Sequence, residues 1–176
     1  MLDRTLRFSD CTVSRLPSVP LLEIRRVRGR PDATVNGTHP IDRPGNLTFV
    51  DGGRLLWLRP GVWLAVAADG QLAKRLWADD GRSWWCSDVT DALVTFQFTG
   101  ADPLARLSHA GPVRDALRFG PGLNRTCARL LLAQVPVVVE GSPSADGTAC
   151  TAWIESPLAE WWWRWWEALA ASEGSP

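Results

Sequence analysis

The sequence lacks an excess of charge of either sign. Its 176 residues hold 19 Lys and Arg against 19 Asp and Glu, so the formal net charge at pH 7 is +0. A chain without a net positive field does not collect the phosphates of a nucleic acid or the anionic headgroups of a membrane. The composition therefore predicts partners that are neither nucleic acids nor membranes.

Long apolar runs are missing as well. No segment reaches the roughly 18 to 20 consecutive apolar residues that a membrane-spanning helix needs. The opening stretch, MLDRTLRFSD, has charged side chains where a secretory signal peptide has its apolar core. These two patterns predict a cytoplasmic protein.

The common catalytic and metal-binding motifs are absent too. None of the patterns GxGxxG, GxxxxGK[ST], HExxH and GxSxG occurs. The cysteines are widely spaced without a CxxC pair, which favours free thiols over a zinc site: Cys11, Cys86, Cys127 and Cys150. His109 could serve as a base, but the sequence does not show a geometric partner for it, and His39 lies in a long loop. We therefore expect no catalytic, cofactor-binding or metal-binding residue in this chain.

One carboxylate pair leaves two interpretations open. Asp88 and Asp91 bracket Val89-Thr90 just before an apolar strand pattern. They could bind an amine or a metal ion, but Asp also favours turns, where its side chain accepts hydrogen bonds from the backbone. The turn is the more common reason for Asp at such a position.

The composition is otherwise that of a folded protein, with 45% hydrophobic and 22% charged residues. A chain of this length predicts a single domain over residues 1–176. Alternating or continuous apolar patterns predict strands at 21–27, 47–50, 54–58, 62–67, 83–86, 92–99, 127–132, 135–140 and 149–155. Helices are expected after Asp69, after Asp102-Pro103 and after Ser156-Pro157. Together they predict an α+β fold, with a mostly antiparallel sheet packed against helices.

A long loop is expected at residues 28–46, which contain several glycines and prolines and no periodic apolar face. Loops of this length are usually functional, mobile or covered by a partner. The loop starts within a local run of basic residues, formed by Arg25, Arg26, Arg28 and Arg30. The run is either a solvated, ion-paired surface or a contact for an acidic partner.

The last helix is unusually rich in Trp, because the chain has 11 Trp and 0 Tyr. At about 100° per residue, four of its five tryptophans share one broad apolar face, which we expect to be the core. Trp163 falls on the opposite side, among Glu160, Arg164 and Glu167. An aromatic side chain among charges is typical of a protein interface. We therefore predict a partner interface that involves Trp163, Glu160, Arg164 and Glu167 on the helix, and Arg28 and Arg30 in the loop.

Four stretches resemble a known family when they are taken in order: WLRPGVWLAVA (57–67), DVTDALVTFQFTGADPLARL (88–107), CARLLLAQVPVVVE (127–140) and AWIESPLAEWWWRWWEAL (152–169). The family is that of the gamma subunit of heterotetrameric sarcosine oxidase, a relative of the folate-binding part of the glycine-cleavage T-protein. The resemblance rests on the order of structural segments and covers most of the chain after Trp57. It implies an aminomethyltransferase-like α+β fold that ends in an aromatic helix.

The resemblance also implies a function. The chain is expected to be a noncatalytic structural subunit beside alpha, beta and delta-like subunits. The implied complex oxidatively demethylates a secondary amine, yielding glycine, hydrogen peroxide and a one-carbon unit that passes to tetrahydrofolate. FAD, FMN, NAD, zinc and tetrahydrofolate are expected in the partner subunits and none of them in this chain. Two alternatives are a stand-alone tetrahydrofolate-binding, aminomethyltransferase-like protein in one-carbon metabolism, and a domain with a shared fold but an unrelated interaction role.

Overall fold

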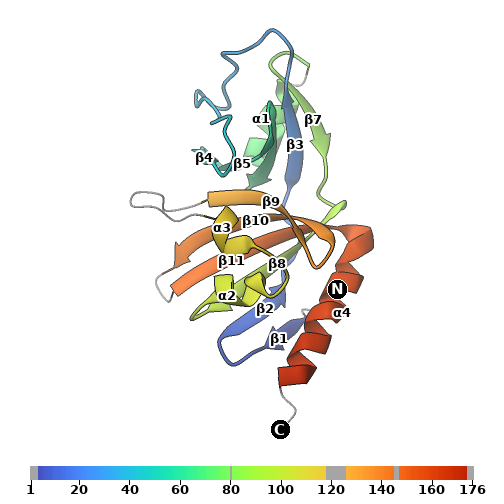
Figure 1. Cartoon of the computed structure of the whole chain (residues 1–176). Coiled ribbons are helices and arrows are strands. Elements are labelled where there is room, and N and C mark those ends of the chain that lie inside the picture. Colours follow the sequence, from blue (N-terminus) through green and yellow to red (C-terminus); the bar gives the residue numbers. More distant parts are fainter. Residues whose placement is uncertain (1–3, 80, 118–125, 145–146, 174–176) are drawn as a thin grey trace. The chain divides into compact units, whose positions relative to one another are not determined.

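A computed structural model describes residues 4–79, 81–117, 126–144 and 147–173 (Figure 1). Contacts within the chain divide it into two compact units. Unit 1 comprises Met1–Pro17 and Ala92–Pro176, and unit 2 comprises Ser18–Asp91. Unit 2 is thus an insertion in the sequence of unit 1. That the two units fold cooperatively as a single domain stays a prediction.

Unit 1 contains a six-stranded sheet in which every pair of neighbours is antiparallel. Its order is β1 (Thr5–Arg7), β2 (Cys11–Arg15), β8 (Leu93–Gly100), β11 (Gly147–Glu155), β10 (Val135–Ser144) and β9 (Thr126–Leu132). Side chains alternate across the strands, so that Phe96 and Phe98 of β8 point into the core while Thr99 is exposed. The sheet therefore has one apolar face that helices cover.

The helices of unit 1 are α2 (Pro103–Ser108), α3 (Val113–Ala116) and α4 (Ser156–Glu173). The side chain of Asp102 caps α2 by accepting a hydrogen bond of 2.8 Å from the backbone N–H of Ala105, as the Asp-Pro pair predicted. Helix α4 lays its indole rings on the phenyl rings of β8: the ring centroids of Trp162 and Phe96 are 5.1 Å apart. This aromatic layer is the centre of the unit 1 core.

Unit 2 contains a five-stranded antiparallel sheet and one helix, α1 (Gln71–Ala78), within its described residues. The strand order is β4 (Leu47–Val50), β5 (Gly53–Arg59), β6 (Val62–Ala67), β3 (Leu21–Arg26) and β7 (Trp84–Asp88). One face of the sheet packs on Leu72 and Leu76 of α1. The same core takes in the indoles of Trp63 and Trp84, whose centroids are 5.6 Å apart.

The structure confirms a mixed fold of antiparallel sheets with few helices, and it contains every strand that the apolar patterns predicted. Strands β1 and β2 and the short helix α3 were not predicted. The Gly-, Ser- and Pro-containing stretch 141–147 has the composition of a loop, yet β10 continues to Ser144 and β11 begins at Gly147. A second stretch with the composition of a turn, 120–124, lies outside the described residues. Among the described helices, none is long and apolar enough to cross a membrane.

Candidate partner-binding surfaces

The loop at 28–46 is irregular, as predicted, apart from an isolated bridge between Val35 and Thr38. It is nevertheless part of the unit 2 core. Ala33 and Val35 are 7% and 3% exposed and pack in the same apolar cluster as the sheet and α1. The loop thus has a buried side, which holds it on unit 2, and an exposed side.

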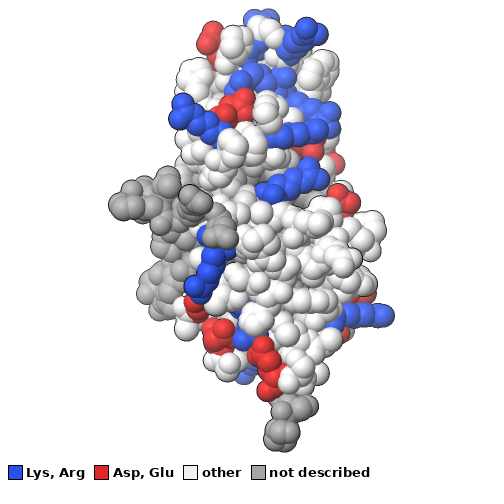
Figure 2. Space-filling model, viewed as in Figure 1, with Lys and Arg blue, Asp and Glu red and all other residues white. Residues whose placement is uncertain are grey.

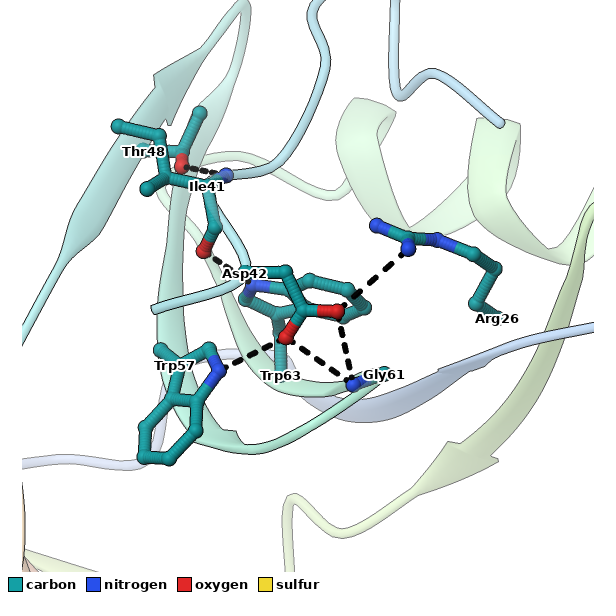
Figure 3. Close-up of polar contacts among 7 residues, drawn as sticks. All are labelled: Arg26, Ile41, Asp42, Thr48, Trp57, Gly61 and Trp63. Carbon is teal, nitrogen blue, oxygen red and sulfur yellow. Dashed lines mark hydrogen bonds and ion pairs between the residues drawn. The ribbon is translucent and has the colours of Figure 1, made fainter. Parts of the chain in front are cut away.

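Three tryptophan side chains fasten the loop by donating their indole N–H groups to it. Trp84 Nε1 donates to the carbonyl oxygen of Thr34 at 3.0 Å, and Trp63 Nε1 donates to that of Ile41 at 3.2 Å. Figure 3 shows the second of these bonds and a third, from Trp57 Nε1 to Asp42 Oδ1 at 2.9 Å. An indole N–H can only donate, so each ring combines apolar packing with one oriented anchor for the loop backbone or its carboxylate.

Asp42 fastens the loop to the turn between β5 and β6. The Gly61 backbone N–H lies 3.1 and 3.2 Å from the two carboxylate oxygens, and Arg26 Nη1 donates to Oδ2 at 3.4 Å (Figure 3). Gly61 has φ +70°, a left-handed conformation that favours glycine. The Arg26 guanidinium also lies over the Trp63 ring, 5.0 Å from its centroid. Asp42 therefore joins loop, turn and sheet through one carboxylate.

The basic run before the loop divides into paired and unpaired side chains. Arg25 pairs with Glu23 at 2.7 Å, and Arg26 pairs with Asp42 at 3.4 Å. Arg28 and Arg30 are exposed and form no ion pair with any described residue. The ion-paired alternative thus holds for Arg25 and Arg26. The assignment of Arg28 and Arg30 to a partner interface stays a prediction.

The structure corrects the position of Trp163. Its side chain is only 3% exposed, stacks on Phe96 at a centroid distance of 5.9 Å, and donates from Nε1 to Glu167 Oε1 at 2.6 Å. The buried row of α4 follows i, i+3, i+4, i+7 spacing, with Ala159, Trp162, Trp163 and Trp166. Trp161, which we had placed in the core, is 50% exposed. The expected helix face was wrong because five tryptophans leave the apolar direction of the helix ambiguous.

The charged residues of α4 are engaged within unit 1. Glu160 accepts from Arg4 Nη1 at 2.9 Å and lies 3.5 Å from Arg164 Nε, one helical turn away. The hydrogen bond from Arg4 is the main reason that the pKa of Glu160 is lowered. Glu167 accepts the Trp163 indole bond. The partner role of Glu160, Arg164 and Glu167 stays a prediction, and the exposed aromatic beside them is Trp161.

The other candidate residues lie in turns or in the core. Asp88 Oδ1 accepts the Thr90 backbone N–H at 2.9 Å, and bonding from Thr90 lowers the Asp88 pKa, as expected for a turn. Cys11 and Cys150 are buried, and burial raises their pKa to about 11 and about 12. Thiols with such pKa values are poor nucleophiles at neutral pH. Within the described residues, no group of three or more His, Cys, Asp or Glu side chains could hold a metal ion.

A solved structure shares the fold of this chain. The chain matches a chain of the heterotetrameric sarcosine oxidase from Corynebacterium sp. U-96, solved in complex with pyrrole 2-carboxylate. The TM-score is 0.74 at 17% sequence identity, and the match covers 94% of this chain and 86% of the other. No family model matches, and no curated protein matches. The two chains therefore share a fold across nearly their full lengths.

Proposed function

We propose that this chain, which has the fold of a subunit of heterotetrameric sarcosine oxidase, is itself a noncatalytic subunit of a complex of that type. The observation that carries the proposal is the extent of the match, 94% of this chain and 86% of the other. A fold match of this extent supports a correspondence between this chain and one subunit of such a complex. The finer assignment to the gamma subunit, with its T-protein-like fold, rests on the four sequence stretches given above.

In this proposal the chemistry belongs to the partners. The complex oxidatively demethylates a secondary amine to give glycine, hydrogen peroxide and a one-carbon unit for tetrahydrofolate. FAD, FMN, NAD, zinc and tetrahydrofolate are held by alpha, beta and delta-like subunits, in the cytoplasm. This chain supplies packing surfaces, and the loop at 28–46 suits that task because the indoles of Trp57, Trp63 and Trp84 fix it in one conformation before any partner arrives. A fixed loop loses little conformational entropy when it docks.

Co-expression with the flavin-bearing subunits encoded in the same genome tests the proposal. We expect the chain to co-elute with them in gel filtration at a fixed stoichiometry, and we expect the chain purified alone to carry no flavin absorbance. Titration of the isolated chain with tetrahydrofolate in a calorimeter should show no saturable heat. One-to-one folate binding at micromolar concentration, without association with flavin-bearing subunits, would replace the proposal by the stand-alone folate-binding alternative.

A further inference from the structure

Exposed arginines and an exposed tryptophan lie at one end of the unit 2 sheet. We call it the arginine surface and define it by Arg28, Arg30, Arg82 and Trp85. All three arginines are exposed, and Trp85 is 55% exposed. Figure 2 shows Lys and Arg side chains gathered at the top of the view, over the end of unit 2 at which β3 ends and β7 begins.

Backbone bonds bring these residues together although they are far apart in the sequence. The N–H of Val27 donates to the carbonyl of Ser83 at 2.9 Å, so the backbones of Arg28 and Arg82 lie opposite each other just beyond the last rung between β3 and β7. The N–H of Arg30 donates to the carbonyl of Val27 at 3.1 Å, so the chain turns back at this rung. The three guanidinium groups therefore extend from a single corner of the sheet.

Trp85 lies at the same corner. It is the register partner of Arg25, whose charge Glu23 compensates at 2.7 Å. Its ring lies against the turn before β7, where a Cβ placed on Gly81 would be 3.4 Å from the ring. Gly81 directly precedes Arg82. The exposed indole is thus next to a cation of the surface.

Among the described residues, no carboxylate pairs with the arginines of this surface. Arg28, Arg30 and Arg82 form no ion pair with a described residue, whereas the neighbouring Arg25 and Arg26 are both paired. Asp32 is two residues beyond Arg30 and forms no ion pair with these guanidinium groups. An exposed arginine without a paired carboxylate is stabilised when carboxylates approach it from outside.

We infer that the arginine surface binds an acidic surface of a partner subunit, in which Asp and Glu side chains surround an apolar slot for Trp85. Arginine matches carboxylates with paired N–H donors, and Trp and Arg are the residues that most often dominate binding energy at protein interfaces. The formal net charge of +0 favours a protein partner over a nucleic acid, because the rest of the chain cancels any long-range field. The inference rests on the proposed function and names the chemistry of the partner contact.

The test compares matched triple variants against the purified flavin-bearing subunits of the same organism. Arg28→Gln/Arg30→Gln/Arg82→Gln removes the cations of the surface, and the control Arg7→Gln/Lys74→Gln/Arg129→Gln removes three exposed, unpaired cations elsewhere. Association is measured by calorimetry at salt concentrations from about 50 to about 300 mM. We expect the surface variant to weaken binding about tenfold or more at low salt and to flatten its salt dependence, and the control to change binding by less than about threefold.

Trp85→Ala removes the indole and leaves the charges unchanged, so it measures the contribution of the indole alone. It should weaken binding about tenfold or more at every salt concentration. Thermal melts check that each variant is folded. If the wild-type chain binds and neither the triple arginine variant nor Trp85→Ala binds more weakly, the role of the arginine surface is wrong. The proposed function is then unaffected. Absence of wild-type binding overturns both. Equal retention of the wild-type chain by a DNA duplex or by anionic phosphatidylserine vesicles, lost in the surface variant, would assign the surface to those anions instead.

Discussion

At the scale of single residues, an indole ring performs different tasks in different parts of this chain. Trp162 and Trp166 are fully buried in unit 1, Trp63 and Trp84 combine burial with an anchoring hydrogen bond in unit 2, and Trp161 is half exposed. The sequence alone does not distinguish these roles, because each side chain is equally apolar. What separates them is the position of the Phe rings and of the loop carbonyls, which depends on tertiary packing.

Trp163 provides the clearest test at this scale. Its ring stacks on Phe96 and is 3% exposed, so Trp163→Ala should leave a cavity and lower the free energy of unfolding by about 3 to 5 kcal/mol. Trp161→Ala is the matched control on the same helix, and because its ring is 50% exposed, the loss should stay below about 1 kcal/mol. Urea unfolding followed by circular dichroism measures both. Equal losses for the two variants would show that the assigned helix face is wrong.

Arg106 predicts how acid affects unit 1. Its side chain is 5% exposed and is bonded to Asp10 and to Glu173, which ties the last turn of α4 to α2 and to the turn before β2. The hydrogen bond from Arg106 is the main cause of the lowered pKa of Asp10. A carboxyl whose pKa is lower in the folded state stabilises the protein above its unfolded pKa, and this contribution is lost as the pH falls through the folded value.

The ordinary pKa of an aspartate is 3.8, and the pKa of folded Asp10 is lower. We therefore expect the free energy of unfolding of the wild-type protein to fall as the pH drops from the first value through the second. Asp10→Asn should be less stable at pH 7 and should lose less stability over that acid range. Glu160→Gln is the control, since its partner Arg4 is exposed and the pair is screened by solvent. Parallel pH profiles for the wild-type protein and Asp10→Asn would contradict the assigned coupling.

At the scale of elements, strands were easier to predict than the helix face. Period-two alternation marks β8, and the Val-rich run marks β10, in which Val137 and Val139 are buried and Val138 is partly buried. The same alternation is present in β2, with Cys11 and Val13 buried, and it was overlooked because β1 and β2 are short. The anchored state of the loop was not predictable, since Asp42, Trp57 and Gly61 meet only after β5 and β6 have paired.

The loop anchor predicts a local loss of order. Asp42→Ala removes the acceptor of the Trp57 indole and of the Gly61 backbone N–H, which should cost about 1 to 3 kcal/mol of stability. Amide hydrogen exchange should accelerate at Gly61 and in the loop, while the amides of α2 and α4 keep their protection. Asp32→Ala, an exposed loop carboxylate without an ion pair, should change neither quantity. Unchanged exchange at Gly61 in Asp42→Ala would contradict the anchoring role.

At the scale of the whole molecule, the sequence predicted the class of fold more readily than it predicted which side chains are exposed. Order and spacing of segments persist at 17% identity, because a strand or helix needs a pattern and not particular side chains. An interface depends on individual exposed residues, and these are decided by which face of each element is buried. The error at Trp163 shows this directly, while the exposure of Arg28 and Arg30 was predictable because a loop without apolar periodicity exposes its charges.

Assembly of the flavin-bearing subunits without this chain, followed by its addition, tests most directly whether the chain is a noncatalytic subunit. The flavin-bearing subunits are purified without this chain, and the mass of the assembly is measured by analytical ultracentrifugation before and after the chain is added, together with amine-dependent peroxide formation. We expect the mass of the assembly to increase by a multiple of 19.4 kDa when the chain is added. We also expect all peroxide formation to depend on the flavin of the partner subunits. An unchanged mass, or peroxide formed by this chain alone, would contradict it.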